Sequence, residues 1–133
     1  HMGVDIWAPA GEPVYSLLGG TVMYTAFHDQ DGNYGGTVVI RHESEGRAIF
    51  ALYGHMSRST LDQSWAGRDV KPGDTVGWLG TPGENGNWHP HLHYQISLKD
   101  PGEADMPGVV SLVDREKAVK TYPNPEELIG PLV

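Results

Sequence analysis

The sequence of 133 residues contains no cysteine. Disulfide bonds and thiolate metal sites are therefore excluded, and any bound metal ion would be held by histidine, aspartate or glutamate. Basic residues are also scarce: 9 Lys and Arg against 17 Asp and Glu give a formal net charge of -8 at pH 7. Such an acidic chain is not expected to bind nucleic acid or to be retained on anionic wall polymers. No apolar run approaches the ~20 residues that span a bilayer, so we expect no membrane span.

What the sequence has in abundance is glycine and proline, 18 and 10 residues respectively, between short strand-like runs. This pattern, at a length typical of one domain, predicts a single mostly β domain over residues 1–133. The expected strands lie within 13–18, 21–27, 37–42, 47–55, 70–80 and 91–98. We expect a tight hairpin at Gly19-Gly20 between the first two strands, a short helix within 109–122, and a terminal tail, 123–133, that packs on the sheet.

Two segments of the chain resemble each other. Gly11-Glu12-Pro13-Val14, followed by Leu18-Gly19, matches the pattern of Gly73-Asp74-Thr75-Val76, followed by Leu79-Gly80. The match indicates either a duplicated β motif or only the general preference of turns for glycine and aspartate.

The segment His91-Leu92-His93 carries the strongest chemical signal. Alternate residues of a strand point to the same face, so the two imidazoles would project side by side. Leu92, Tyr94 and Ile96 would then face the opposite way, toward a core. A strand of this kind has one apolar face for packing and one histidine face for chemistry.

A metal site is predicted if the first residues of the chain lie beside the histidine face of this strand. His1 and Asp5 have even spacing and can share a face with His93. Two imidazoles and one carboxylate suit Zn²⁺ and leave a position for water, whose pKa zinc lowers to about 7. His55 and His91 are then the candidates for the general base.

The remaining histidines have no partner in the sequence pattern. We expect His28 and His42 to be solvated, and His89 to lie at the rim of the cleft because Pro90 interrupts the strand.

Four segments, HMGVDIWAPAGEPV, LYGHMS, VKPGDTVGWLG and HPHLHYQI, span about residues 1–98 in this order. Together they resemble the lysostaphin/LytM-type zinc metallopeptidases. The resemblance implies a compact antiparallel β-sheet/barrel-sandwich hybrid, the duplicated hybrid motif. It implies that His1, Asp5 and His93 bind zinc, and that His55 and His91 form the catalytic pair. One of the pair would act as general base and the other would steady the oxyanion, in either order.

The implied function is that of a zinc-dependent metalloendopeptidase acting on glycine-containing or peptidoglycan-type peptides. Finer features, including PAGEPV, PGENGNWHPHLHYQ and Tyr122-Pro123-Asn124-Pro125, resemble a subgroup embedded in bacterial proteins with kinase-like and class III aminotransferase domains. This predicts a domain excised from a larger protein, with the other domains as partners. Its location would be cytoplasmic in such a fusion, and the cell envelope or outside the cell for a typical member. The family usually has a site-lining tyrosine before the first ligand, a position that the present sequence does not include.

Three other functions compete with the peptidase hypothesis. The chain could be a catalytically inactive or regulatory binding module of a multidomain protein, although the presence of all five polar residues favours an enzyme. A cupin-like oxygenase or isomerase would need a carboxylate shortly after His93, where Ile96 and Ser97 stand. A biotinyl or lipoyl carrier would need a lysine at a hairpin tip, where Gly19-Gly20 offers none.

Overall fold

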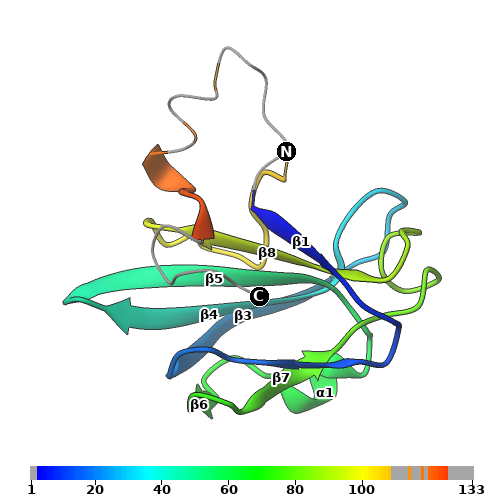
Figure 1. Ribbon diagram of the computed structural model, residues 1–133, viewed down its shortest axis with the longest axis horizontal. Coiled ribbons are helices and arrows are strands. Elements are labelled where there is room, and N and C mark those ends of the chain that lie inside the picture. Colours follow the sequence, from blue (N-terminus) through cyan, green and yellow to red (C-terminus); the bar gives the residue numbers. More distant parts are fainter. Residues whose placement is uncertain (1–2, 109–113, 115–117, 119, 126–133) are drawn as a thin grey trace.

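The computed structural model describes residues 3–108, 114, 118 and 120–125, the side chain of residue 63 excepted. Its main element is a six-stranded sheet in which all the pairings are antiparallel (Figure 1). In order across the sheet the strands are β1 (Val4–Trp7), β8 (His91–Ser97), β5 (Arg47–Met56), β4 (Gly35–Ser44), β3 (Gly20–His28) and β6 (Asp69–Val70). A second sheet pairs β2 (Pro13–Tyr15) with β7 (Thr75–Trp78), and one short helix, α1, covers Thr60–Gln63. The mostly β fold class is confirmed.

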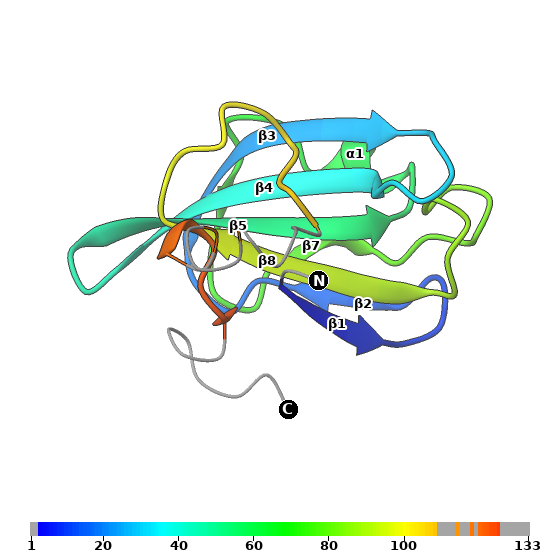
Figure 2. The same ribbon diagram turned by 90° about the horizontal axis from the view of Figure 1, so that it is seen from above.

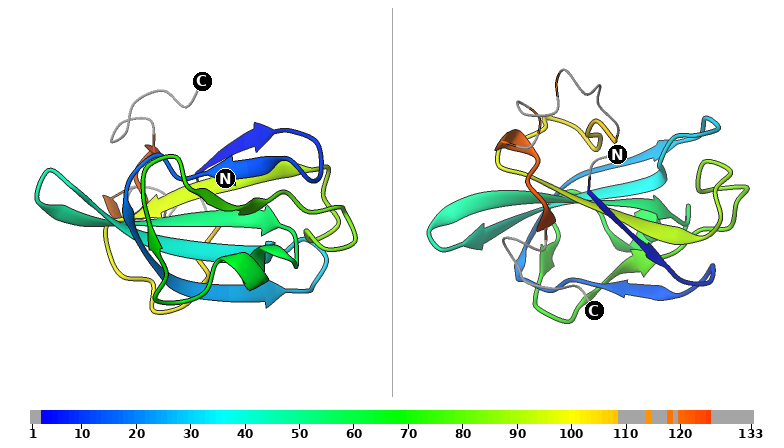
Figure 3. Two further views of the ribbon diagram at one scale, coloured as in Figure 1. Left: turned by 90° about the horizontal axis from the view of Figure 1, so that it is seen from below. Right: turned by 45° about the horizontal axis from the view of Figure 1, so that its top comes forward.

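The principal core lies between the two sheets, which form separate layers in Figure 3. Val14 of β2 and Val76 of β7 pack into the same buried cluster as residues of the large sheet. That cluster includes Leu92, Tyr94 and Ile96, which confirms the apolar face predicted for β8. Because side chains alternate along a strand, the odd-numbered residues of β8 are directed to the opposite face of the sheet.

The opposite face carries a smaller buried cluster beneath the loop that follows β8. The loop crosses over β5, β4 and β3 in Figure 2. Ala104 and Met106 from this loop pack with Val39, Phe50 and Leu52 of the sheet. The Tyr24 hydroxyl donates to Asp100 Oδ1 at 2.6 Å, and the His28 ring lies 2.6 Å, Nε2 to oxygen, from the Ala104 carbonyl. The loop therefore forms a wall on the face of the sheet that carries His91 and His93.

The predicted hairpin at Gly19-Gly20 is wrong. β2 pairs with β7, whereas β3 begins at Gly20 and pairs with β4 and β6. A Cβ atom at Gly20 would collide with the Arg41 carbonyl of β4, so glycine is required here for close approach between strands and not for a turn. The two similar segments that contain β2 and β7 are neighbours, with Pro13 opposite Trp78 and Val14 opposite Gly77.

The C-terminal elements lie largely outside the described residues. Of the helix predicted within 109–122, the structure describes residues 114, 118 and 120–122, where the Tyr122 N–H donates to the Ala118 carbonyl at 2.7 Å. The Leu98 N–H donates to the Thr121 carbonyl at 2.8 Å, which ties this segment to the end of β8. Residues 126–133 of the predicted tail are outside the described part. No helix among the described residues is long and apolar enough to cross a membrane.

The expectation that His42 is solvated is also wrong. His42 is 2% exposed, and its Nδ1 lies 2.9 Å from the Gly19 carbonyl. Because a carbonyl oxygen only accepts, Nδ1 carries the hydrogen. Burial lowers the pKa of His42 from its ordinary value of 6.5, and the hydrogen bond to Gly19 opposes this only in part. His28 is half-buried beside the loop after β8.

A pH dependence of stability follows from the buried His42. Because its pKa is lower in the folded state, the unfolded chain binds the proton first as the pH falls below about 6.5. The contribution of neutral His42 to the free energy of unfolding is therefore fully present above this pH and is lost progressively below it. We expect the free energy of unfolding in urea to fall less between pH 7 and pH 5 in His42→Gln than in the unsubstituted chain. His89→Gln, at an exposed position, is the matched control; equal slopes in all three proteins would refute the assignment.

Candidate active site

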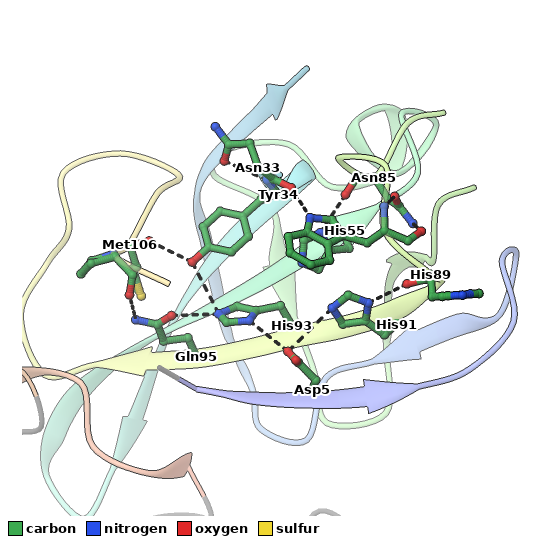
Figure 4. Close-up of polar contacts among 12 residues, drawn as sticks. Asp5, Asn33, Tyr34, His55, Asn85, His89, His91, His93, Gln95 and Met106 are labelled. Carbon is green, nitrogen blue, oxygen red and sulfur yellow. Dashed lines mark hydrogen bonds and ion pairs between the residues drawn. The ribbon is translucent and has the colours of Figure 1, made fainter. Parts of the chain in front are cut away.

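The pairing of β1 with β8 builds the centre of the site. Asp5 lies opposite His93, and Trp7 lies opposite His91. Residues opposite each other in an antiparallel pair project to the same face, so these four side chains form two neighbouring cross-strand pairs. Asp5 Oδ1 is 3.1 Å from His93 Nδ1 and 3.8 Å from His91 Nε2 (Figure 4). Both imidazoles are buried, at 3% exposure, while the Asp5 carboxylate is half-buried.

His55 reaches this face through an irregularity in β5. Simple alternation would place His55 on the same side as Tyr53, in the core between the sheets. The register instead shifts: Val38 pairs with Tyr53, but Gly36 pairs with Met56, so β5 contains one extra residue. His55 adopts a left-handed conformation with φ of 63° within this bulge. The bulge places the imidazole beside His91, with ring centroids 4.4 Å apart.

Backbone carbonyls determine the tautomers of His55 and His91. His55 Nδ1 lies 2.8 Å from the Asn85 carbonyl, and His91 Nδ1 lies 2.7 Å from the His89 carbonyl. Each Nδ1 must donate, because carbonyl oxygens only accept. In the neutral rings, Nε2 is therefore the acceptor nitrogen in both residues, available to take a proton.

The orientation of His93 is determined by Gln95, its neighbour on the same face of β8. The Gln95 amide nitrogen donates to the Pro107 carbonyl at 3.0 Å, so its Oε1 is the atom that faces His93 Nε2, at 2.9 Å. His93 Nε2 consequently donates to Oε1, and in the neutral ring Nδ1 is the acceptor nitrogen that faces Asp5. An acceptor nitrogen and a carboxylate oxygen 3.1 Å apart form an arrangement suited to a shared cation.

Tyr34 is a site residue that the sequence reasoning missed. It belongs to the loop before β4, and its hydroxyl donates to the Met106 carbonyl at 2.9 Å and lies 3.5 Å from His93 Nε2. The ring fits against Gly54, where a Cβ atom would come within 2.9 Å of Tyr34 Cδ1. Burial, followed by the nearby charges of Asp105 and Asp5, raises the pKa of Tyr34, so the hydroxyl stays protonated.

His55 is held in its neutral form. Burial lowers its pKa to about 4, a shift that the hydrogen bond to the Asn85 carbonyl partly offsets. Neighbouring His91 and His93 lower the pKa further, and Asp5 raises it. The ring is thus a neutral imidazole with an acceptor Nε2 at neutral pH.

These residues line a cleft of about 490 Å³. Its floor is polar, with the Asp5 carboxylate and three imidazoles, and three aromatic rings and a second carboxylate, that of Asp105, also border it. The lining residues are Asp5, Trp7, Gly32, Asn33, Tyr34, His55, Trp88, His91, His93, Asp105, Met106 and Gly108. A cleft with apolar walls and a few convergent polar groups is typical of a ligand-binding site.

Four of the five predicted site residues, Asp5, His55, His91 and His93, line this one cleft. The fifth, His1, lies outside the described residues, and its role as a ligand stays a prediction. Within the described part of the chain, no group of three or more His, Asp or Glu residues is arranged to hold a metal ion. The pair that could contribute to such a centre is Asp5 and His93. His89 is exposed next to the cleft and contributes its carbonyl to His91.

Two kinds of site residue escaped the sequence analysis for different reasons. Gln95 shares the parity of His91 and His93 on β8, so alternation alone could have identified it. Tyr34 and Trp88 lie in loops, where no periodicity predicts the direction of a side chain.

Comparison with known proteins shows the family to which the chain belongs. The sequence model of peptidase family M23 matches residues 1–106. The chain is 32% identical over 121 residues to the peptidoglycan DD-endopeptidase ShyC of Vibrio cholerae, covering 88% of this chain and 25% of that protein. It is 34% identical over 98 residues to the DD-carboxypeptidase/endopeptidase Mpg of Neisseria meningitidis, covering 74% of this chain and 20% of that protein. The chain thus spans a quarter or less of the length of these two relatives.

Solved structures show the same fold. The catalytic domain of the prophage-encoded M23 protein EnpA from Enterococcus faecalis superposes with a TM-score of 0.63 at 28% identity, covering 82% of this chain and 79% of that one. The catalytic domain of lysostaphin from Staphylococcus simulans gives a TM-score of 0.64 at 22% identity, covering 98% and 80%. With the family model matching residues 1–106 and the described site residues gathered in one cleft, the chain belongs to peptidase family M23.

Proposed function

We propose that this domain is a zinc-dependent metalloendopeptidase that hydrolyses peptide bonds in peptidoglycan-type or glycine-containing peptides. The observation that carries the proposal is the position of the Asp5–His93 pair next to the His55–His91 pair in one open cleft. The first pair has ligand atoms that suit a cation, and the second has two imidazole acceptors for proton transfer.

The donor set fits zinc. Carboxylate oxygen and imidazole nitrogen are ordinary ligands of this ion, and Asp5 Oδ1 and His93 Nδ1 face each other. Gln95 supports His93 from behind by accepting from its other ring nitrogen, an arrangement typical of zinc-binding histidines. We propose His1 as the third protein ligand. When bound, zinc would supply Lewis acidity toward the scissile carbonyl and lower the pKa of water in the cleft.

The chain's own residues would manage the protons. His55 and His91 each offer Nε2 as an acceptor, and their Nδ1–H bonds to carbonyls prevent rotation of the rings. One of them would take the proton of the attacking water at Nε2. The other would stabilise the oxygen that gains negative charge by donating from a protonated Nε2, that is, in its imidazolium form. Burial lowers the pKa of His55 and so keeps it neutral and able to accept a proton.

The substrate class is proposed from the relatives. ShyC and Mpg are named for endopeptidase activity, which in ShyC is directed at peptidoglycan. On this basis we propose a peptidoglycan stem or cross-bridge peptide as substrate and the cell envelope as the location. The relatives described above lend no support to a cytoplasmic location. Membership of the narrower aminotransferase-fusion subgroup stays a prediction.

Metal binding provides the first test. The purified chain should contain close to one zinc ion, and His93→Ala should remove it, because the variant loses a ligand. Gln95→Leu should retain zinc but weaken its affinity by about 10–100-fold, since the His93 ring loses its orienting partner. Elemental analysis and competition with a chelator measure both effects. Thr21→Val, which removes an exposed hydroxyl bond to Asp69 at the edge of the sheet opposite β1, is the control. Full zinc content in His93→Ala would exclude the assigned ligand.

Hydrolysis provides the second test. His55→Ala and His91→Ala should keep zinc but lose roughly 10²–10⁴-fold in kcat/KM, the usual contribution of general acid–base catalysis. Cleavage of pentaglycine and of a cross-linked peptidoglycan peptide, followed by mass spectrometry, measures the loss. His89→Ala, at the exposed neighbour of the cleft, should remain active because the backbone carbonyl that holds His91 is unchanged. Loss of zinc from either variant would place that histidine among the ligands, and no cleavage by the zinc-loaded parent chain would favour a binding module.

A further inference from the structure

Two exposed tryptophans border the catalytic histidine pair, and nothing in the catalytic chemistry requires them. Trp7, the last residue of β1, is 65% exposed, and Trp88, just before β8, is 44% exposed. Both line the cleft with His55 and His91. Large aromatic surfaces left in water beside a polar cleft are typical of surfaces that bind a partner molecule.

Trp7 is positioned by the same strand register that builds the site. It lies opposite His91, and the two ring centroids are 4.6 Å apart with an angle of 39° between the planes. His91 itself is 3% exposed, so the indole helps to cover it. With one part of its surface on His91 and nearly two thirds exposed, Trp7 presents an apolar wall next to a reacting group.

Trp88 is held rigidly on the other side of the pair. Its backbone N–H donates to Asn85 Oδ1 at 2.9 Å, and its indole N–H donates to the Asn33 carbonyl at 3.2 Å. The indole lies 5.8 Å from His55 and 6.2 Å from His91, centroid to centroid. The first bond lies within the loop before β8, and the second joins this loop to the loop before β4, so the ring is held in place beside the cleft.

We propose that Trp7 and Trp88 are specificity-determining residues that bind the peptide chain of the substrate next to the scissile bond. Their exposed indole surfaces would stack on peptide groups and on small side chains. Preorganised aromatic rings bind with little loss of side-chain entropy, and tryptophan is enriched among the residues that dominate binding energy. The proposal rests on the proposed peptidase function for the identity of the ligand, but its first test needs no catalysis.

The binding test uses indole N–H signals in ¹H–¹⁵N NMR spectra. The chain has 4 tryptophans, whose signals can be assigned by single Trp→Phe substitutions. Titration of the chelator-treated chain with pentaglycine, and separately with a synthetic peptidoglycan stem tetrapeptide, should shift the signals of Trp7 and Trp88. The signal of Trp65 should not move; it is 56% exposed, lies outside the cleft and has Arg68 near its ring. Absence of any shift at Trp7 and Trp88 with both peptides would overturn the proposal.

The kinetic test separates substrate binding from support of His91. Trp7→Ala should raise KM about tenfold or more, with a smaller change in kcat and with zinc content unchanged. Trp7→Phe should recover most of the loss, and Trp65→Ala should behave like the unsubstituted chain. A fall in kcat at constant KM in Trp7→Ala would show that the indole only positions His91, and would overturn the binding role. If both peptides shift the two indole signals but no peptide is cleaved, the proposed peptidase function fails while the peptide-binding role of the two indoles stands.

Discussion

The antiparallel register between β1 and β8 is the constraint on which the site depends. It places Asp5 opposite His93 and Trp7 opposite His91, all on one face of the large sheet. Because the side-chain period of a strand is two residues, a slip by one residue would move Asp5 and Trp7 to the other face. The slip would also take Val4 out of its contact with the core between the sheets. Burial of the apolar face therefore enforces the geometry of the polar face.

The second requirement is a local departure from regular structure. The bulge in β5 turns His55 away from the core and toward His91, with a left-handed backbone that non-glycine residues rarely adopt. Such a conformation costs on the order of 1–3 kcal/mol. Neighbouring contacts hold it in place: the His55 N–H donates to the Tyr34 carbonyl at 2.6 Å, and the His55 carbonyl accepts from Gly80 at 3.0 Å. Strain of this kind is characteristic of functional sites.

The loop after β8 holds the side chains that surround His93 in place. It accepts hydrogen bonds from Tyr34 at Met106 and from Gln95 at Pro107, and both donors lie beside the His93 ring. The loop is thus both a wall of the cleft and a support for His93. The Tyr34 ring packs against Gly54, and any side chain at position 54 would collide with it.

Most strand positions and the two faces of β8 could be read from the sequence, because alternation is a local property of an extended chain, but β1 was not among the predicted strands. Even spacing along an extended chain allowed Asp5 to share a face with His93, but the pairing of β1 with β8 was not predicted. Tertiary structure decided the rest. The Gly19-Gly20 dipeptide is compatible with a hairpin, but β2 pairs with β7 instead of with β3. The two similar segments, which are far apart in the sequence, are therefore neighbours in the structure.

His42 looked like a solvated strand-end residue, yet the approach of Gly19 buried it and satisfied its ring nitrogen. His55 would have pointed into the core by alternation, and only the bulge brought it to the cleft. Tyr34 and Trp88 lie in loops, whose side-chain directions depend on contacts far away in the sequence. The sequence by itself determined which reactive side chains one face of β8 carries. The three-dimensional packing decided which residues from distant parts of the chain lie next to them.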